Sequence, residues 1–352
     1  MASDRNARHG TAEYGSVPAW TLSGSGFLPA ILLALVSGCS EAPGNVGGGG
    51  PPGDPGDVTP RFTYAGPVLT DLPPLLEEEL DQHETERDWA IVRGTLEWAR
   101  SREFQELPPG ELAAVLGTTF VGTPYEPGTL ELPGEERLVV NLRGFDCVTL
   151  VEHLAVLSRI TLTASPSLLA DESELRDRYR DEVTLIRYRG GEMDGYASRL
   201  HYFSEWLQDA EAKGILRDMT RELGGVVDPR PIHFMSSNPS SYRQLAEDPM
   251  QLEAVRATEG TLNERVRYYI PQERIAEIES RILNGDVIAA VSTVDGLDVA
   301  HTGIAIRHAG RVHLLHAPLV GDSVEISERP LAERILGISG QQGVIVARFL
   351  AP

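Results

Sequence analysis

The chain is poor in cysteine, in positive charge and in long hydrophobic runs. Its 352 residues include only two cysteines, and 31 lysines and arginines stand against 52 aspartates and glutamates. The formal net charge of −21 repels phosphate backbones, so we expect no nucleic-acid partner. With 41% apolar and 24% charged residues, the composition is still that of a globular protein.

The one strongly apolar stretch covers residues 27–36. It is short for a membrane span and is typical of the hydrophobic region of a signal peptide. Val36-Ser37-Gly38-Cys39 follows, the pattern of a lipobox whose cysteine is acylated and becomes the new N-terminus. The alternatives are an uncleaved N-terminal anchor and a chance apolar run. We expect residues 1–39 to be a lipoprotein signal peptide, with Cys39 as the lipidated residue.

Glycine and proline dominate residues 40–60, a composition typical of a tether that buries no core. We therefore expect the folded domain over residues 61–352. The anchor and tether predict a protein held at the periplasmic face of a bacterial membrane. By resemblance to other lipoproteins, Ser40 rather than aspartate after the anchor cysteine favours the outer membrane.

Lipidation of Cys39 would leave Cys147 as a free thiol in an exported protein, which calls for an explanation. Cys147 follows Asp146 and precedes an apolar run, so the sequence predicts a thiol at the N-terminus of a buried helix. The unpaired N–H groups and the dipole of a helix start favour thiolate over thiol. The alternative is a small buried hydrophobic residue.

Predicted helices come first along the chain and predicted antiparallel strands later, which indicates an α+β fold. We expect a helical lobe over about residues 61–225 and a β-rich lobe over about residues 226–352. The predicted helices are 75–100, 112–116, 147–162, 173–180, 202–213 and 272–283, and the predicted strands are 137–142, 184–189, 286–292, 302–307, 311–316, 324–326 and 344–348.

Two histidines lie far downstream of the cysteine, on the two strands of a predicted hairpin. A cysteine followed at long range by histidines is the pattern of a nucleophile and its base. His301 opens a strand and is the candidate base and acid, because its ordinary pKa is near neutral. His316, on the next strand, could accept a hydrogen bond from the far ring nitrogen of His301. The backbone N–H of Cys147 is a candidate oxyanion donor, while the alternative for both histidines is a core hydrogen bond.

His313 and His316 could also suggest a metal pair. Residues three apart on a strand point to opposite faces, and no carboxylate stands at a suitable spacing. We therefore expect neither a metal nor another cofactor.

Several short motifs together resemble one known family, the NlpC-type superfamily of papain-fold cell-wall hydrolases, and within it the N-acetylmuramoyl-L-alanine amidase-like subfamily. The resemblance covers roughly residues 75 to 350. The motifs are Gly122-Thr123-Pro124-Tyr125, Phe145-Asp146-Cys147, Arg199-Leu200-His201-Tyr202-Phe203-Ser204-Glu205-Trp206, Phe234-Met235-Ser236, Gly296-Leu297-Asp298-Val299-Ala300-His301-Thr302-Gly303 and His316-Ala317.

The resemblance implies a papain-like fold with a helical lobe that carries the cysteine and a small antiparallel β-barrel lobe that carries the histidines. It implies hydrolysis of the amide between N-acetylmuramic acid and L-alanine in peptidoglycan or its fragments. The roles that it implies are nucleophile for Cys147, base for His301 and orienter for His316, with the substrate side lined by Tyr125, Asp146, Arg199, His201 and Tyr202. We expect a monomer.

Two other functions fit the same residues. One is an endopeptidase of the same fold that cleaves within the stem peptide. The other, from a different class, is a non-catalytic, tethered glycan-binding lipoprotein in which Cys147 only packs. For Arg199 the alternative is a surface ion pair in an acid-rich protein. For Tyr202 and Trp206, four apart on a helix, it is core packing.

Overall fold

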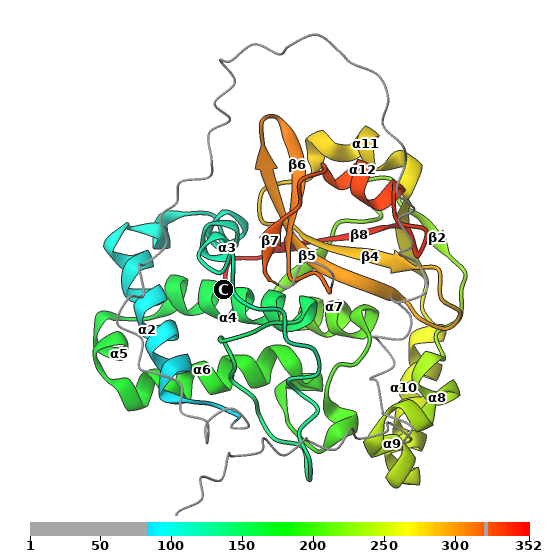
Figure 1. Ribbon diagram of the computed structural model, residues 1–352, viewed down its shortest axis with the longest axis horizontal. Helices are drawn as coiled ribbons and strands as arrows, with labels where there is room; N and C mark the ends of the chain where they lie inside the picture. The colour runs from blue at the N-terminus through cyan, green and yellow to red at the C-terminus, as the bar shows by residue number, and fades with distance from the viewer. Residues whose placement is uncertain (1–82, 320–322) are drawn as a thin grey trace, which may run out of the picture.

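The computed structural model describes residues 83–319 and 323–352, shown as coloured ribbon in Figure 1. The predicted signal peptide at residues 1–39, the predicted lipid site Cys39 and the predicted linker at residues 40–60 lie outside the described residues. Within the described ranges, no helix has the length and apolar character that a membrane crossing needs.

Helices precede most strands along the chain, as the sequence predicts, and the α+β class is confirmed. The helices are α2 (Glu86–Ser101), α3 (Pro109–Thr118), α4 (Cys147–Thr163), α5 (Pro166–Ala170), α6 (Glu172–Arg187), α7 (Phe203–Ala212), α8 (Phe234–Ser237), α9 (Arg243–Glu247), α10 (Pro249–Asn263), α11 (Ile275–Ile278) and α12 (Leu331–Leu336). The strands are β1 (Leu216–Asp218), β2 (Val226–Asp228), β3 (Arg267–Pro271), β4 (Val287–Ser292), β5 (Val299–His308), β6 (Arg311–His316), β7 (Glu325–Ile326) and β8 (Gln341–Phe349).

The strands form one antiparallel sheet in the order β2-β3-β8-β4-β5-β6-β7, and β1 pairs with β8 beside this path. The sheet is open: β2 and β7 lie at its two ends, and these short strands do not pair with each other. The prediction of a small closed β-barrel is therefore wrong. The β-rich half of the molecule is an open sheet because its end strands, of three and two residues, offer little edge to pair.

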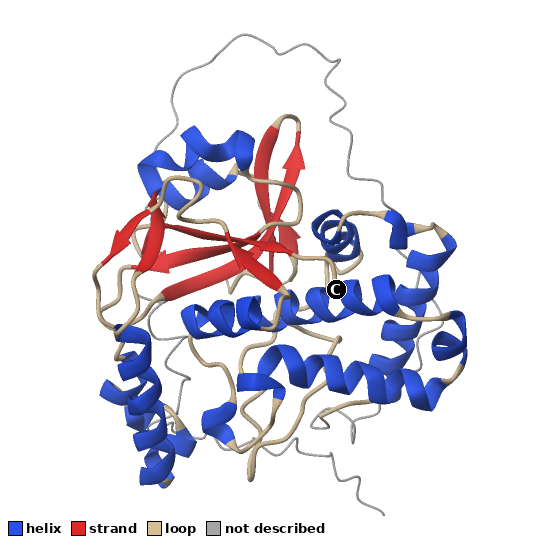
Figure 2. Ribbon diagram, turned by 180° about the vertical axis from the view of Figure 1, so that it is seen from behind, coloured by secondary structure: helices blue, strands red, loops and turns tan. Residues whose placement is uncertain are grey.

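Both faces of the sheet are covered by helices, as Figure 2 shows. Alternate residues of a strand point to opposite faces, and the two sides of β4 enter different cores. Val287, Ala289 and Val291 pack in the large core that contains α2, α3, α4 and α6. Ile288 and Ala290 pack in a second core with residues of α11 and α12. Because β4 is buried on both faces, it and its neighbour β5 form a rigid centre.

Helix α4 lies against this centre and is buried almost all round, as its sequence predicts. Its first residue is Cys147, where the helix was expected to begin. The side chain of Asp146 accepts hydrogen bonds from the backbone N–H groups of Val148 (3.0 Å) and Thr149 (2.8 Å). Thr149 Oγ1 accepts in turn from the N–H of Asp146, which completes a capping box. This cap determines which residue occupies the helix start.

The predicted strand at residues 184–189 is wrong, because most of it is the last turn of α6. Leu175, Tyr179, Val183 and Ile186 recur at helical spacing and are all buried in the large core. This helical period outweighs the local strand preference of Thr184-Leu185-Ile186.

Two further predicted elements also differ. Residues 137–142 join no sheet, because the N–H groups of Val140 and Leu142 donate to His83 O and to the carboxylate of Asp88. Residues 272–283 form three short turns rather than one helix, with α11 in the middle.

Candidate active site

The thiol of Cys147 lies where the start of α4 meets the start of β5. The backbone N–H of Thr302, on β5, is close enough to stabilise a thiolate at Cys147, as are the N–H groups of Cys147 and Val148 at the helix start. Cys147 is half-buried, and Val148 beside it is 38% exposed. The sulfur therefore lies next to the residue that follows His301.

The resting form of this thiol is neutral, which differs from the expectation of a stabilised thiolate. Burial raises the pKa of Cys147 to about 12, and the negative charge of Asp146 adds to the rise. The three backbone N–H groups oppose this shift without reversing it. The helix start thus moves the pKa in the predicted direction, but desolvation is the larger effect.

The two histidines are in contact, as the predicted hairpin requires. His301 Nε2 and His316 Nδ1 lie 2.9 Å apart, with the rings at an interplanar angle of 86°. His301 is the third residue of β5 and His316 the last of β6, and the β5–β6 register places Ile304 opposite Leu315 beside them. Burial, together with the nearby charge of Arg334, lowers the pKa of His301 to about 3. Both partners in a transfer from Cys147 to His301 are therefore uncharged at neutral pH.

Between the described side chains of Cys147 and His301 there is no hydrogen bond. The ring nitrogen of His301 that is not bonded to His316 is Nδ1, so this is the atom that could receive a proton from the thiol. Catalytic hydrogen bonds are often long in the absence of substrate and shorten when it binds. The transfer requires the sulfur and Nδ1 of His301 to come within hydrogen-bond distance.

Tyr125 belongs to the same neighbourhood. It is half-buried and forms a β-bridge with Phe145, two residues before the cysteine. Its pKa is raised by burial and by the nearby charges of Cys147 and Asp146. Asp146, predicted on the substrate side, has its carboxylate occupied by the cap of α4.

A small apolar cavity of about 10 Å³ adjoins the thiol; it is lined by Val148, Val151, Phe203, Trp206 and Thr302. A space of this size holds about one water molecule and is too small to hold a substrate. Trp206 is 4% exposed and packs in the large core, which fits the packing alternative for this residue.

Arg199, His201 and Tyr202 form a separate cluster whose polar atoms are occupied by the protein itself. The guanidinium of Arg199 donates to Leu130 O (2.8 Å), pairs with the carboxylate of Glu131 and lies over the ring of Tyr196. Arg199 thus forms an ion pair, as its alternative interpretation has it, but its guanidinium is buried and not at the surface.

His201 and Tyr202 are paired in the same way. His201 Nε2 donates to Tyr196 O at 2.9 Å, and burial lowers the pKa of His201 to about 3. The hydroxyl of Tyr202 donates to Glu259 (2.7 Å) and accepts from the N–H of Met235 (2.8 Å). These bonds connect the start of α7 to α8 and α10.

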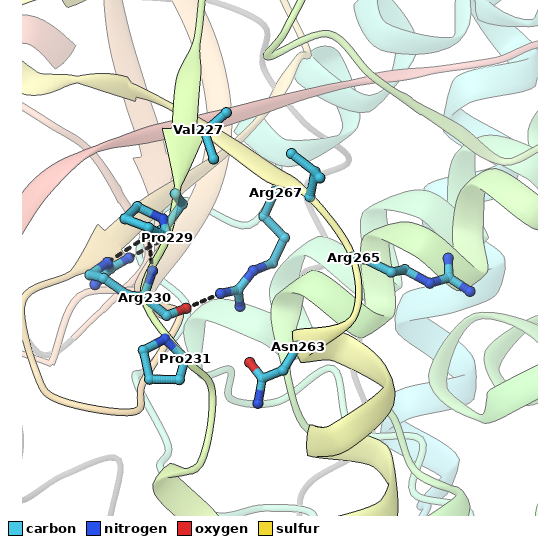
Figure 3. A pocket seen from close by; sticks show the side chains of 9 residues that line it. Val227, Pro229, Arg230, Pro231, Asn263, Arg265 and Arg267 are labelled. Atoms are coloured by element: carbon cyan, nitrogen blue, oxygen red, sulfur yellow. Dashed lines mark hydrogen bonds and ion pairs between the residues drawn. The ribbon is translucent and has the colours of Figure 1, made fainter.

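A larger cavity, of about 240 Å³, lies near the ends of β2 and β3, away from the thiol (Figure 3). Its arginines are engaged: Arg230 binds both oxygens of Asp228, and Arg267 donates to Arg230 O. Arg265 points away from the other two. None of the predicted catalytic residues lines this cavity, so its size does not make it the reaction site.

No three His, Cys, Asp or Glu side chains converge as metal ligands within the described ranges. His313 Nδ1 lies 2.8 Å from Ser327 O, whereas His316 faces His301, so these two histidines do point apart.

The sequence reasoning missed three residues near the thiol. Thr302 supplies an N–H group to the sulfur, and Asp298 accepts from the N–H of Ser204 (2.7 Å), which fixes the start of α7 beside β5. Both stand in the Gly296–Gly303 motif and could have been found there. Glu325 lies beside His316, and only the register between β6 and β7 reveals it.

The structure is a mixed α+β fold with an open antiparallel sheet. It has a thiol at a helix start beside two paired imidazoles, and these features define the class of protein to which the chain is similar. The model of the AmiA-like, N-acetylmuramoyl-L-alanine amidase-like family matches residues 115–340, and the chain belongs to this family of amidase-like hydrolases. No curated protein sequence matches the chain.

Solved structures agree with this membership. An N-acetylmuramoyl-L-alanine amidase from Bacteroides uniformis is 32% identical, with a TM-score of 0.63 over 68% of this chain and 98% of that chain. A Bacteroides fragilis protein provisionally named a xylanase is also 32% identical, with a TM-score of 0.61 over 66% and 99%. A Legionella pneumophila protein, 18% identical with a TM-score of 0.53 over 75% and 95%, shares the fold.

Proposed function

We propose that the chain is a cysteine-dependent amidase that hydrolyses the bond between N-acetylmuramic acid and L-alanine in peptidoglycan or muropeptides. Cys147 is the nucleophile, His301 the base and His316 the residue that orients it, on a papain-like arrangement of helix and sheet. The observation that carries the proposal is the 2.9 Å contact between His301 and His316 beside a thiol at the start of α4.

The chemistry follows from the positions of these groups. His301 Nδ1 takes the thiol proton as the sulfur of Cys147 attacks the lactyl carbonyl carbon. The oxyanion that forms lies near the backbone N–H of Cys147 at the helix start. His301 then returns the proton to the nitrogen of L-alanine, the C–N bond breaks, and a thioester remains. Water, deprotonated by His301, hydrolyses the thioester and restores the thiol.

The amidase name of the Bacteroides uniformis structure supports this choice of bond. A glycosidase, as the xylanase name of the other neighbour suggests, uses two carboxylates that flank the scissile bond. The proposed site is instead built on a thiol and two imidazoles, and Asp146 beside the thiol caps α4 through Oδ1.

The expected location is part of the same proposal. A lipid on Cys39 and the glycine- and proline-rich residues 40–60 would hold the domain at the periplasmic face of the outer membrane, beside peptidoglycan. Labelling of cells with a radioactive fatty acid, comparing the wild type with Cys39→Ala, tests the anchor.

Mass analysis of the products from one defined muropeptide tests the reaction. The wild type should release free N-acetylmuramic acid and an intact stem peptide, and Cys147→Ala should release neither. Release of shortened peptides by the wild type would instead show an endopeptidase. Undiminished release by Cys147→Ala would reject a cysteine mechanism.

One observation favours the non-catalytic alternative: burial raises the pKa of Cys147 to about 12, as it would for a packed thiol. A glycan-binding protein would bind the muropeptide tightly and leave it intact for both wild type and Cys147→Ala. A calorimetric titration run beside the product analysis separates the two functions.

A further inference from the structure

A carboxylate lies next to the pair formed by His301 and His316, on the side of His316. His316 is fully buried, and its Nε2 lies 3.5 Å from Oε1 of Glu325. Glu325 is directly opposite His316 in the register between β6 and β7. Within the described residues His316 Nε2 makes no hydrogen bond, and the carboxylate of Glu325 lies just beyond bonding distance of it. A buried N–H that lacks an acceptor destabilises a fold, so Glu325 is the group placed to accept this proton.

The proposed mechanism requires that His301 donate a hydrogen bond to His316 and that His316 donate one to Glu325. His301 can accept the proton of Cys147 only if its Nδ1 is unprotonated, so its own proton must be on Nε2. That proton is donated to His316 Nδ1, which must then be unprotonated as well. The proton of a neutral His316 is therefore on Nε2, the atom that faces Glu325. The opposite tautomer of His316 would reverse both bonds and protonate His301 on the side of the thiol.

We propose that Glu325 is a positioning residue: its carboxylate accepts the Nε2 proton of His316 and so holds His301 in the tautomer that can deprotonate Cys147, a role that rests on the proposed cysteine mechanism. Glu325 reaches no reacting atom, and it acts through His316.

The surrounding charges favour a neutral, donating His316. Arg334 of α12 disfavours the imidazolium form of both histidines, and burial acts in the same direction. Burial raises the pKa of Glu325, Arg334 opposes this rise, and Glu328 adds to it. The side chain of Glu325 is 42% exposed, so water helps to keep the carboxylate solvated.

Steady-state kinetics on a defined muropeptide test this role. Glu325→Ala should lower kcat by roughly 10–100-fold with little change in KM, the size of effect seen when a residue that orients a functional histidine is removed. Glu325→Gln, whose amide oxygen can still accept, should lose measurably less. Glu328→Gln removes a neighbouring charge that makes no contact with His316 and should match the wild type.

Nitrogen-15 NMR of the histidine rings gives a readout that needs no turnover. In the wild type, the proton of His316 should be on Nε2, and in Glu325→Ala it should move in part to Nδ1. Unchanged tautomers together with unchanged kcat in Glu325→Ala would overturn the proposal. Should that variant fail to fold, Glu325→Met, which has a similar volume and no strong acceptor, decides in the same way. Activity that survives Cys147→Ala would reject the cysteine mechanism instead, which keeps the two failures distinct.

Discussion

Two groups of polar residues were expected to serve the substrate, and they differ in how their hydrogen bonds are used. In the cluster of Arg199, His201 and Tyr202, the polar groups bind the protein's own backbone and carboxylates. At the start of α4, Cys147 is half-buried, and beside it His301 makes no hydrogen bond through Nδ1 within the described residues while its Nε2 contacts His316. A polar group whose hydrogen bonds are all made within the protein stabilises the fold, whereas a catalytic group needs an atom that is free to bond the reactant.

The two buried histidines give the strongest test of this difference. Burial lowers the pKa of His301 and of His201 to about 3 in each case, so the pKa does not distinguish them. We expect His301→Ala to reduce kcat/KM by about 10²–10⁴-fold, the usual contribution of a general base. His201→Ala should leave kcat/KM per folded molecule close to that of the wild type. Equal losses of kcat/KM in His301→Ala and His201→Ala would show that the two histidines do not differ in this way.

Arg199 should contribute to stability more than to turnover. Arg199→Ala leaves carboxylates without their buried partner, and we expect a loss of about 3 kcal/mol in the free energy of unfolding. Arg217→Ala is the matched control, because Arg217 and Glu222 form an exposed pair and such a pair contributes about 1 kcal/mol or less. Urea unfolding of both variants measures the difference, and a normal unfolding curve with a raised KM for Arg199→Ala would instead indicate substrate binding.

Tyr202 offers a smaller version of the same test. Tyr202→Phe removes the acceptor of the Met235 N–H and the donor to Glu259, which we expect to destabilise the protein by about 1–3 kcal/mol. Thermal unfolding measures it, and kcat should not change. A fall in kcat with the same melting temperature would place this hydroxyl on the substrate.

Asp146 connects the two kinds of role, since it caps α4 and raises the pKa of Cys147. Asp146→Asn keeps a good cap and removes the charge, so stability should be near wild type and the pKa of Cys147 should fall. Alkylation of the thiol at a fixed pH would then be faster. Asp146→Ala also loses the cap and should be less stable by about 1 kcal/mol. Slower alkylation in Asp146→Asn would contradict the electrostatic role.

Residue patterns predicted the parts of the fold that depend on local periodicity. The start of α4 at Cys147 and the hairpin of β5 and β6 are where their patterns place them. The open sheet was missed because closure depends on how the end strands β2 and β7 meet, which no local pattern encodes.

At the site, the sequence indicated which residues have reactive side chains. It did not indicate how burial and neighbouring charges together set their pKa values. The helix start suggested a thiolate at Cys147, yet desolvation by the surrounding core raises its pKa, and burial depends on the whole fold. The sequence did not indicate a role for Glu325, because Glu325 lies beside His316 only as a result of the pairing between β6 and β7. Both properties are set by contacts between segments distant in the sequence.

The most direct test of the central claim is a titration of activity against alkylation of Cys147 by iodoacetamide, with the modified residue identified by peptide mapping. The loss of muropeptide hydrolysis should equal the fraction of Cys147 that is alkylated. Because the pKa of Cys147 is raised to about 12, the alkylation rate should also rise about tenfold per pH unit from neutral to alkaline pH. Full alkylation of Cys147 with undiminished hydrolysis would contradict the account.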